Sequence, residues 1–509
     1  MSLPALGSGL DDLPDHLADD TDVLVVGLGI TGAGVALDAA ARGLRVLAVD
    51  AHDVAFGTSR WSSKLVHGGL RYLAHGQVGV AHESAVERGV LMERTAPHLV
   101  RALPMVLPLH DRVGRADALL TASGLRAGDL LRLAAGTRRS TLPRPRRLGV
   151  AETTALAPGV RRDGLRGSLL SWDGQLEDDA RLVLAVARTA VREGAVVRTG
   201  VRADALDATG ATLTDARTGD TLRVRARVVV NATGVWAGGL VPGASLRPSR
   251  GTHVVLRAGA VPGTSAVMAP VPGSRSRFVF ALPQPDGLVY AGLTDEPVDA
   301  VEDVPAVPEA DVDFLLRVLG PVLERPPTHD DVVGAFAGLR PLLGGGGASA
   351  DLSRRHAVLT HGGVVTVVGG KLTTYRRMAQ DAVDTAVRVA GLTAAPCRTR
   401  ALPLVGAAPA TGPTGATARL VRRFGSEAAD VVASAATTTG LPLAELTGPA
   451  APGTAVTLAE LVFGVTHEAA RSVEDLLERR TRVGLVAADA EALRPAARRA
   501  LDLARPSPG

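Results

Sequence analysis

The sequence predicts an α/β fold in which a domain built on buried parallel strands is interleaved with a strand-rich domain and followed by helices. Three observations lead to this prediction. A buried strand, a glycine turn and a helix follow one another over 22–53; short strands with Pro and Gly turns dominate 250–340; and helical patterns run from about 396 onward. The 509 residues, 46% of them hydrophobic, can form several domains with a large core.

The first element is the unit "DVLVVGLGITGAGVALDAAARGLRVLAVDAHD" at residues 22–53. After the apolar strand, Gly27, Gly29 and Gly32 follow the G-x-G-x-x-G spacing. These glycines permit a tight turn, a close approach to a pyrophosphate and packing of the next helix. Asp50 ends the second strand and would accept a hydrogen bond from a ribose hydroxyl. The unit predicts a dinucleotide site, and its place near the start of a long chain favours FAD over NAD.

The next segment, "TSRWSSKLVHGGLRYL" at residues 58–73, combines hydroxyl, glycine and basic residues. It suits a second phosphate or flavin contact, with a solvated loop as the alternative. The segment also holds one of only two lysines among 56 basic residues, Lys64 and Lys371. A lysine ammonium is a compact charge, whereas an arginine guanidinium is a wide planar fork. An arginine-rich chain is therefore expected to keep lysine at sites that arginine does not fit. The alternative is that the two lysines stand where they do by chance.

A leucine-rich helical pattern with an arginine cluster occupies residues 119–147. An apolar face beside arginines fits a helix on an anionic membrane surface, and a helix packed on its own domain is the alternative. No run reaches the roughly 18 apolar residues of a spanning helix. The acidic first twenty residues lack the pattern of a secretory signal and suggest a loose lead. We therefore expect a cytoplasmic protein, peripheral on the inner face of the cell membrane.

The remaining elements complete the predicted domains. A helix is expected over 78–100, a helix and strand over 178–208, a hairpin over 211–226 and a buried strand running into a glycine turn over 225–240. "VVGGKLTTYR" places Lys371 after a buried strand and before a helix. The N-terminus of a helix stabilises negative charge on a bound group, so this position suits an anion or a reduced flavin. The lone Cys397 excludes a disulfide within the chain or a cysteine-ligated metal centre, and no metal is expected. The nucleotide part is expected at about 20–100, 170–240 and 350–395, the substrate part at 101–169 and 241–349, and the helical domain at 396–509.

Eight motifs occur in a fixed order along the chain: "GLGITGAGVALDAAARG", "GTSRWSSKLVHGGLRYL", "WDGQLEDDARL", "VVNATGVWA", "RGTHVVL", "YAGLTDEP", "GLRPLL" and "VVGGKLTTYR". In this order the chain resembles the FAD-dependent, quinone-linked glycerol-3-phosphate dehydrogenases from about residue 20 to 395 and into the tail. The resemblance implies a glutathione-reductase-type FAD-binding domain, an antiparallel or mixed-sheet substrate domain and a C-terminal helical cap domain. It implies oxidation of sn-glycerol 3-phosphate to dihydroxyacetone phosphate, with hydride passing from C2 to flavin N5 and electrons passing to a membrane quinone.

The resemblance also assigns site residues. His253, Arg340 and Lys371 are implied as catalytic. A phosphate dianion suits forked arginines, and a base near neutral pH suits histidine. We favour His253 as the base because it sits on a strand, whereas His67 could instead touch the flavin. The substrate contacts implied are Arg71, His67 and Arg354, and the FAD contacts are Gly27, Gly29, Gly32, Asp50, Thr58, Ser59, Ser63, Thr233, Gly234, Gly370, Leu372 and Thr373.

Two departures and three alternatives accompany the resemblance. Arg355 stands where the family often has an acid, which can move the Arg354 assignment by one position, and "GGGGASA" replaces a more acidic loop. The expected partners are glycerol 3-phosphate, a membrane quinone, an anionic membrane surface and a second copy in a homodimer, with no nucleic acid. The alternatives are a glycerol-3-phosphate oxidase that uses oxygen, an amine or 2-hydroxy-acid flavoenzyme of the same fold, and a flavin-carrying binding protein.

Overall fold

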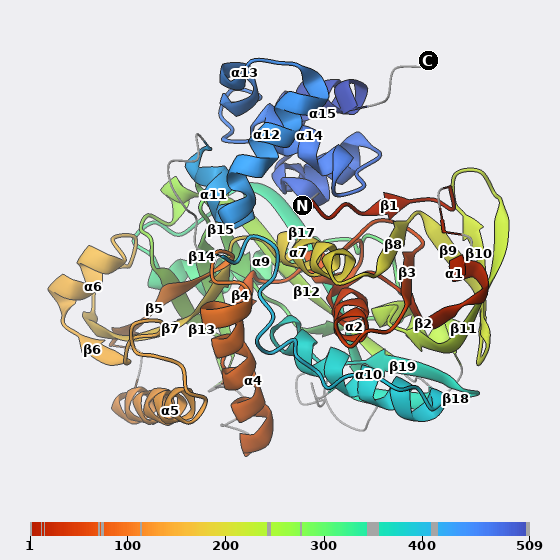
Figure 1. Ribbon diagram of the computed structural model, residues 1–509. Helices are drawn as coiled ribbons and strands as arrows, with labels where there is room; N and C mark the ends of the chain where they lie inside the picture. The colour runs from red at the N-terminus through yellow and green to blue at the C-terminus, as the bar shows by residue number, and fades with distance from the viewer. Residues whose placement is uncertain are drawn as a thin grey trace.

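Two large β-sheets and a group of C-terminal helices make up the structure, a computed structural model (Figure 1). It describes residues 3–11, 13–14, 16–69, 72, 76–111, 114–241, 246–274, 277–343, 356–408 and 416–504. Within these residues the chain passes between the two sheets several times, so that segments distant in sequence meet where the sheets adjoin. None of the helices in the described part of the chain is both long and apolar enough to cross a membrane.

The first sheet has a parallel centre covered by helices. Val23 and Val25 of β2 face the helical side, where they join the core formed with α2, α7 and α10. Leu24 and Val26 alternate to the opposite side and pack with the hairpin strands. Strands β2, β3, β8, β11 and β19 pair in parallel, and β9, β10 and β18 are antiparallel to their neighbours. The bounds are β1 Gly7–Ser8, β2 Thr21–Val26, α2 Ile30–Ala41, β3 Val46–Asp50, α7 Asp179–Arg192, β8 Val196–Thr199, β9 Val201–Asp207, β10 Gly210–Asp215, β11 Thr221–Asn231, β18 Ala357–His361, β19 Val364–Val368 and α10 Tyr375–Ala390.

The start of the chain is tied to this sheet. Strand β1 pairs in parallel with β8, Leu6 is buried, and its backbone N–H donates to the His467 carbonyl at 3.0 Å. A short helix, α1 (His16–Asp19), then leads into β2. The expectation of a loose N-terminal lead was therefore wrong, because an acidic composition does not reveal backbone pairing with a distant strand.

The second sheet is mixed and largely antiparallel, as predicted for 250–340. Its long strands β12 and β17 pair over their full length, and β13 joins β5 in parallel. Helix α9 (Glu309–Leu319) covers one face with Leu315 and Leu319 against Val254 and Val279. The bounds are β4 Leu65–Val66, β5 Val100–His110, β6 Arg146–Leu148, β7 Leu165–Leu176, β12 Leu246–Arg257, β13 Ala266–Pro270, β14 Phe278–Pro283, β15 Leu288–Gly292, β16 Glu296–Pro297 and β17 Val332–Leu343.

Helices outside the two sheets complete the architecture. The helix expected over 78–100 is α4 (Val78–Val90), extended by a wider turn to Thr95, after which the chain enters β5. The leucine-rich segment forms α5 (Arg115–Ala134), which lies at the lower left of Figure 1. The C-terminal helices, drawn in blue, form their own core around Leu461 and Phe463. The other helices are α6 Val150–Leu156, α8 Ala237–Leu240, α11 Ala418–Phe424, α12 Ala428–Thr439, α13 Leu443–Thr447, α14 Leu458–Thr466 and α15 Ala487–Ala504.

Buried ion pairs join the C-terminal helices to the rest of the chain. Arg181 forms a bidentate pair with Glu468, and Arg188 contacts Glu427 at 2.8 and 3.2 Å. Two further sets complete what we call the arginine seam: Arg423 with Asp178, and Arg479 and Arg480 with Asp53. Because forked guanidinium–carboxylate contacts fix both position and orientation, the seam sets how these helices sit on the first sheet.

Candidate functional site

A cavity of about 1690 Å³ lies between the two sheets. Its wall beside the first sheet comes from the glycine turn and Asp50 at the ends of β2 and β3. The wall beside the second sheet includes His253 and Arg340, and part of α5 contributes Leu120 and Leu125. The cavity therefore meets the carboxyl ends of parallel strands, where open α/β sheets bind their ligands.

The glycine turn after β2 leaves room for a close ligand. Gly27 has a φ of +101°, and a Cβ there would lie 2.7 Å from the Ala232 carbonyl oxygen. A Cβ on Gly32 would lie 1.8 Å from the Gly27 carbonyl oxygen, so Gly32 serves the packing of α2 on the turn. Helix α2 begins at Ile30, whose N–H donates to the Ser59 hydroxyl at 2.9 Å. This turn and helix start form a cradle that suits a pyrophosphate.

Asp50 stands at the end of β3 with its carboxylate at the cavity. Its Oδ2 accepts from the Leu28 N–H at 2.6 Å, and its Oδ1 accepts from the His52 N–H at 2.9 Å. Burial raises the pKa of Asp50, while the two N–H donors and His52 act in the opposite direction. Each carboxylate oxygen has a second lone pair, so Asp50 can also accept from a ribose hydroxyl.

The second glycine turn, after β19, forms another part of the cavity wall. Gly369 and Gly370 have φ values of +74° and +77°, and a Cβ on Gly370 would meet Met378 Sδ at 2.5 Å. Lys371 follows, and a short 3-10 turn over Leu372–Thr374 precedes α10, which begins at Tyr375. The Lys371 ammonium donates to the Ser84 hydroxyl and lies 4.3 Å from the centre of the Tyr72 ring.

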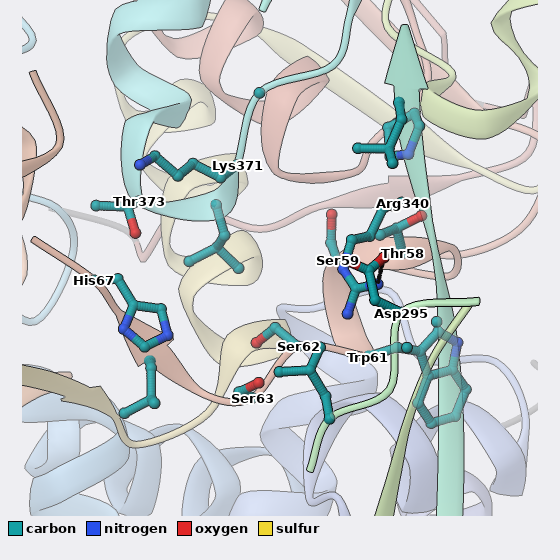
Figure 2. Close-up of a pocket in the computed structure, with 18 of the residues that line it drawn as sticks. Thr58, Ser59, Trp61, Ser62, Ser63, His67, Asp295, Arg340, Lys371 and Thr373 are labelled. Carbon is teal, nitrogen blue, oxygen red and sulfur yellow. Dashed lines mark hydrogen bonds and ion pairs between the residues drawn. The ribbon is translucent and has the colours of Figure 1, made fainter. Parts of the chain in front are cut away.

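Arg340 is held at the cavity by acceptors on a neighbouring segment. Its Nη1 donates to Asp295 Oδ1, and its Nη2 donates to the Thr294 carbonyl, both at 3.1 Å. A Cβ on Gly251 would lie 2.1 Å from Arg340 Nη2, so Gly251 leaves space for the guanidinium. Figure 2 shows Arg340, Asp295, Thr58 and Ser59 on one side of the cavity, and Lys371, Thr373 and His67 on the other.

His67 is oriented by a buried carboxylate. Its Nδ1 lies 3.0 Å from Asp173 Oδ2, and Asp173 Oδ1 accepts from Arg88 at 2.7 Å. Burial alone would raise the pKa of Asp173, but Arg88 and His67 together lower it to about 2. Asp173 is thus an ionised carboxylate, which can accept hydrogen bonds but cannot donate one. The proton shared between the two side chains therefore lies on Nδ1 of His67. In the neutral ring the other nitrogen, Nε2, is then an acceptor on a side chain that lines the cavity.

His253 occupies a drier part of the wall. Its Nε2 lies 2.8 Å from the Ser63 hydroxyl, and its ring stacks on Phe336 with centroids 4.8 Å apart. Burial lowers the pKa of His253 well below its ordinary value, and the charges of Lys64 and Arg340 add to this effect. His253 is therefore a neutral imidazole within the hydroxyl–imidazole pair that it forms with Ser63.

Most of the predicted site residues meet at this one cavity. Gly32 does not line it and instead packs against Gly27, while Arg71 and Arg354 lie outside the described residues. The roles of all these residues stay predictions. Those lining the cavity are Gly27, Gly29, Asp50, Thr58, Ser59, Ser63, His67, Thr233, Gly234, His253, Arg340, Gly370, Lys371, Leu372 and Thr373.

Sequence reasoning missed the acidic partners of the site. Asp173 and Asp295 both line the cavity, and each fixes a predicted site residue. Both lie inside motifs that the sequence singled out, "WDGQLEDDARL" and "YAGLTDEP", so the motifs were a usable signal. Trp61 and Tyr72 also line the cavity within the segment 58–73.

Comparisons with known proteins agree with this geometry. Residues 22–376 match the FAD dependent oxidoreductase family, and residues 397–507 match the C-terminal domain of alpha-glycerophosphate oxidase. The chain is 52% identical over 483 residues to glycerol-3-phosphate dehydrogenase 1 of Mycobacterium tuberculosis, with 92% of each chain covered. The chain belongs to the FAD-dependent glycerol-3-phosphate dehydrogenases.

Two further members and an oxidase extend the comparison. The aerobic glycerol-3-phosphate dehydrogenase of Staphylococcus aureus is 35% identical over 407 residues, covering 76% of this chain and 71% of the relative. The solved glycerol-3-phosphate dehydrogenase of Bacillus halodurans, complexed with FAD, has a TM-score of 0.70 and 28% identity and covers 95% of this chain and 91% of its own. An L-alpha-glycerophosphate oxidase from Mycoplasma pneumoniae, at 18% identity and a TM-score of 0.57 over 76% of this chain and 99% of its own, shares the fold.

The cavity of this chain fits FAD, the cofactor of the family. The cradle at Gly27 and Gly29 suits the pyrophosphate, and Asp50 suits the ribose. The turn at Gly370 and Lys371 brings a cation to the same cavity, where it would stabilise the negative charge that FAD acquires on reduction. The expected fold class and cofactor are confirmed.

Proposed function

We propose that the chain oxidises sn-glycerol 3-phosphate to dihydroxyacetone phosphate and that its electrons leave through a membrane quinone. Bound FAD supplies the hydride acceptor, N5, for the hydrogen on C2 of the substrate. One observation supports the substrate most directly. The cavity that contains the nucleotide cradle is also lined by a forked cation, Arg340, by Lys371 and by an oriented histidine, His67.

The cationic wall suits the substrate phosphate. Arg340 is presented by Asp295 and Thr294 in a fixed orientation, which lowers the cost of ordering it around a ligand. A phosphate dianion accepts forked, charge-assisted hydrogen bonds from such a guanidinium. Arg71 and Arg354 remain proposed further contacts, and Lys371 is proposed to hold the substrate or the negative edge of the flavin.

The geometry favours His67 over His253 as the base. His67 donates its Nδ1 proton in a hydrogen bond to Asp173. Its Nε2 can therefore accept the hydroxyl proton of the substrate when C2 loses its hydride. His253 is more deeply buried, and its Nε2 already contacts Ser63. His253 stays the alternative base, acting through the Ser63 hydroxyl.

An anaerobic titration of the yellow protein tests both the substrate and the base. We expect sn-glycerol 3-phosphate to bleach the flavin absorbance, and lactate and glycine to leave it unchanged. His67→Asn should slow the bleaching by about a hundredfold or more, since general base catalysis contributes that much, while FAD stays bound. His253→Asn should slow it less. Bleaching by a carboxylate substrate alone would support the 2-hydroxy-acid or amine enzyme, and no bleaching at all would support a binding protein.

Helix α5 supports the membrane and quinone part of the proposal. Ala118, Ala122 and Leu125 pack it on the second sheet, whereas Leu119 and Leu130 are both 66% exposed. Leu119 and Leu130 are eleven residues apart and therefore lie on one helical face. The exposed arginines Arg138, Arg144 and Arg146 follow the helix. Exposed leucines beside arginines suit an anionic bilayer surface.

The same helix also lines the cavity, through Leu120, Thr121 and Leu125. A quinone could therefore reach the cavity from a bilayer in contact with α5. Vesicles of phosphatidylglycerol test this route. We expect the protein to bind them at low salt, to detach at high salt and to reduce a quinone dissolved in them.

Serine substitutions provide the matched comparison. The double variant L119S/L130S should lose vesicle binding, whereas Leu443→Ser, at a 59% exposed leucine of α13, should retain it. Equal binding by both variants would contradict docking through α5, and brisk peroxide production without vesicle binding would favour the oxygen-using oxidase. Docking on the inner face of the cell membrane and a homodimer belong to the same proposal, and light scattering checks the dimer.

A further inference from the structure

Lys64 lies next to the cavity wall but does not line it. It is 2% exposed, and its ammonium donates to the Arg60 carbonyl at 3.0 Å, the Ser62 carbonyl at 3.1 Å and Asp179 Oδ2 at 2.8 Å. An ammonium has three N–H bonds, and here each has its own acceptor. A guanidinium has five N–H bonds in a planar fork and could not be satisfied by this tripod, which explains a lysine in an arginine-rich chain.

The tripod fixes the turn that bears two cavity hydroxyls. Asp179 Oδ2 also accepts from the Ser62 N–H at 2.9 Å, so one carboxylate holds both ends of the turn. Lys64 itself has a φ of +57°, a left-handed conformation that a non-glycine residue keeps only when its surroundings hold it there. Ser62 and Ser63 line the cavity as a result of this turn (Figure 2).

Lys64 reaches His253 through two contacts. The Ser63 hydroxyl, one residue away in the same turn, is hydrogen-bonded to His253 Nε2. The Phe336 ring, on which His253 stacks, also lies 4.9 Å from the Lys64 ammonium. The positive charge of Lys64 adds to burial in lowering the pKa of His253.

We infer that Lys64 is a positioning residue: its ammonium holds the Ser62–Ser63 turn and the His253 imidazole in place in the cavity wall. The inference rests on the proposed function for its effect on catalysis. Lys64 does not line the cavity proposed to hold the substrate, so its loss should change the rate of flavin reduction rather than the affinity for substrate.

Replacement by an uncharged side chain of similar length tests the inference. In Lys64→Met, we expect FAD to stay bound, the limiting rate of flavin reduction to fall about ten- to hundredfold and the half-saturating substrate concentration to change by less than about threefold. Protonation of His253 would change its hydrogen bond with Ser63 and slow reduction whichever histidine is the base. The acid limb that this protonation produces should move to higher pH, because the repulsion that lowers the pKa of His253 is gone.

Arg188→Met is the matched control. Arg188 is equally buried, lies 2.8 Å from a carboxylate of Glu427 and 4.8 Å from the centre of the Phe463 ring, but belongs to the arginine seam. It should lower stability without moving the pH profile of reduction. Equal profiles for the Lys64 and Arg188 variants would overturn the inference.

Asp179→Asn gives an independent result. Its amide oxygen can still accept from Ser62 and Lys64, but the negative charge that holds the ammonium is lost. The limiting rate of flavin reduction should then fall, while the half-saturating substrate concentration changes by less than about threefold. If Lys64→Met does not fold, this variant decides, and an unchanged limiting rate overturns the inference.

A readout without turnover separates this inference from the proposed function. In histidine-labelled protein, the His253 ring signal is identified by its absence in His253→Asn. Lys64→Met should raise the pH at which that signal titrates. A wild-type flavin that glycerol phosphate fails to bleach would contradict the proposed substrate, whereas an unchanged His253 titration in Lys64→Met would contradict the role of Lys64.

Discussion

Asp295 accepts a hydrogen bond from the Arg340 guanidinium at 3.1 Å across 45 residues of sequence. The carboxylate fixes the plane of the fork toward the cavity, so the pair forms one preorganised unit. The antiparallel register of β12 and β17 places Arg340 opposite Ser249. The Ser249 hydroxyl also contacts Asp295, at 2.5 Å, so the register brings both side chains to the same carboxylate.

Asp295→Asn should therefore weaken substrate binding. We expect the KM for glycerol 3-phosphate to rise about ten- to hundredfold, since a charge-assisted hydrogen bond contributes about 1.5–3 kcal/mol, with a smaller change in kcat. Steady-state assays with an artificial electron acceptor measure this effect. Asp313→Asn is the control, because Asp313 pairs with His329 at 2.7 Å on the surface of the same sheet domain. An unchanged KM in the first variant would remove Asp295 from the site.

Gly27→Ala should abolish FAD binding. An alanine Cβ would lie 2.7 Å from the Ala232 carbonyl oxygen, and the φ of +101° disfavours any side chain. We expect colourless protein after purification, checked by the ratio of absorbance at 450 nm to that at 280 nm. Gly43→Ala, at a φ of +85° with no atom within 4 Å of the new Cβ, should lose some stability and stay yellow. Two equally yellow proteins would contradict the cradle.

The two lysines make a selective titration practical. Burial and, next, the charge of Arg482 lower the pKa of Lys64 to about 8, despite the opposing charge of Asp179. In protein with ¹⁵N-labelled lysine, we therefore expect one side-chain signal to titrate near pH 8, well below the usual value of about 10.4. Its absence from Lys64→Met would assign it. Two signals that both titrate at ordinary values would show that Lys64 is solvated.

Asp173 should contribute to stability at neutral pH and lose that contribution in acid. Its pKa of about 2 in the folded chain lies below the ordinary 3.8, so the unfolded state binds the proton first as the pH falls. The contribution, about 2 kcal/mol, should be complete above about pH 4 and disappear as the pH falls to about 2. Urea unfolding across this range should show a steeper loss for the wild type than for Asp173→Asn.

Asp331→Asn provides the comparison for this prediction. Asp331 also has a pKa of about 2, set first by its hydrogen bond to Arg325, but that arginine is exposed. Added salt should therefore remove the effect of Asp331 and leave the effect of buried Asp173 nearly unchanged. Identical salt responses would contradict the difference in burial.

The sequence predicted those parts of the site that depend on local geometry. The positions of Gly27, Asp50 and Gly370 follow from a strand, a turn and a helix that are adjacent in the chain, and the structure brings all three to one cavity. The second sheet was likewise visible in short strands separated by Pro and Gly turns. Such features require no knowledge of distant partners.

The parts that were missed depend on partners far apart in sequence. Asp173 reaches His67 across 106 residues, and Asp179 reaches Lys64 across 115. Periodicity cannot indicate these pairings, because they arise only when β4 pairs with β7, a strand about a hundred residues away in the sequence. For the same reason the sequence marked Lys64 as unusual but could not show that its ammonium is buried against backbone carbonyls.

The arginine seam has a consequence for synthesis of the chain. Asp53, Asp178, Arg181 and Arg188 are buried charges whose partners lie beyond residue 420. At roughly 5–20 residues per second, a ribosome needs about 5–20 s to make the last hundred or so residues. During that interval these charges cannot be buried without a large desolvation cost. We expect the nascent oxidoreductase part to stay loosely folded, exposed to chaperones and proteases, until the C-terminal helices emerge.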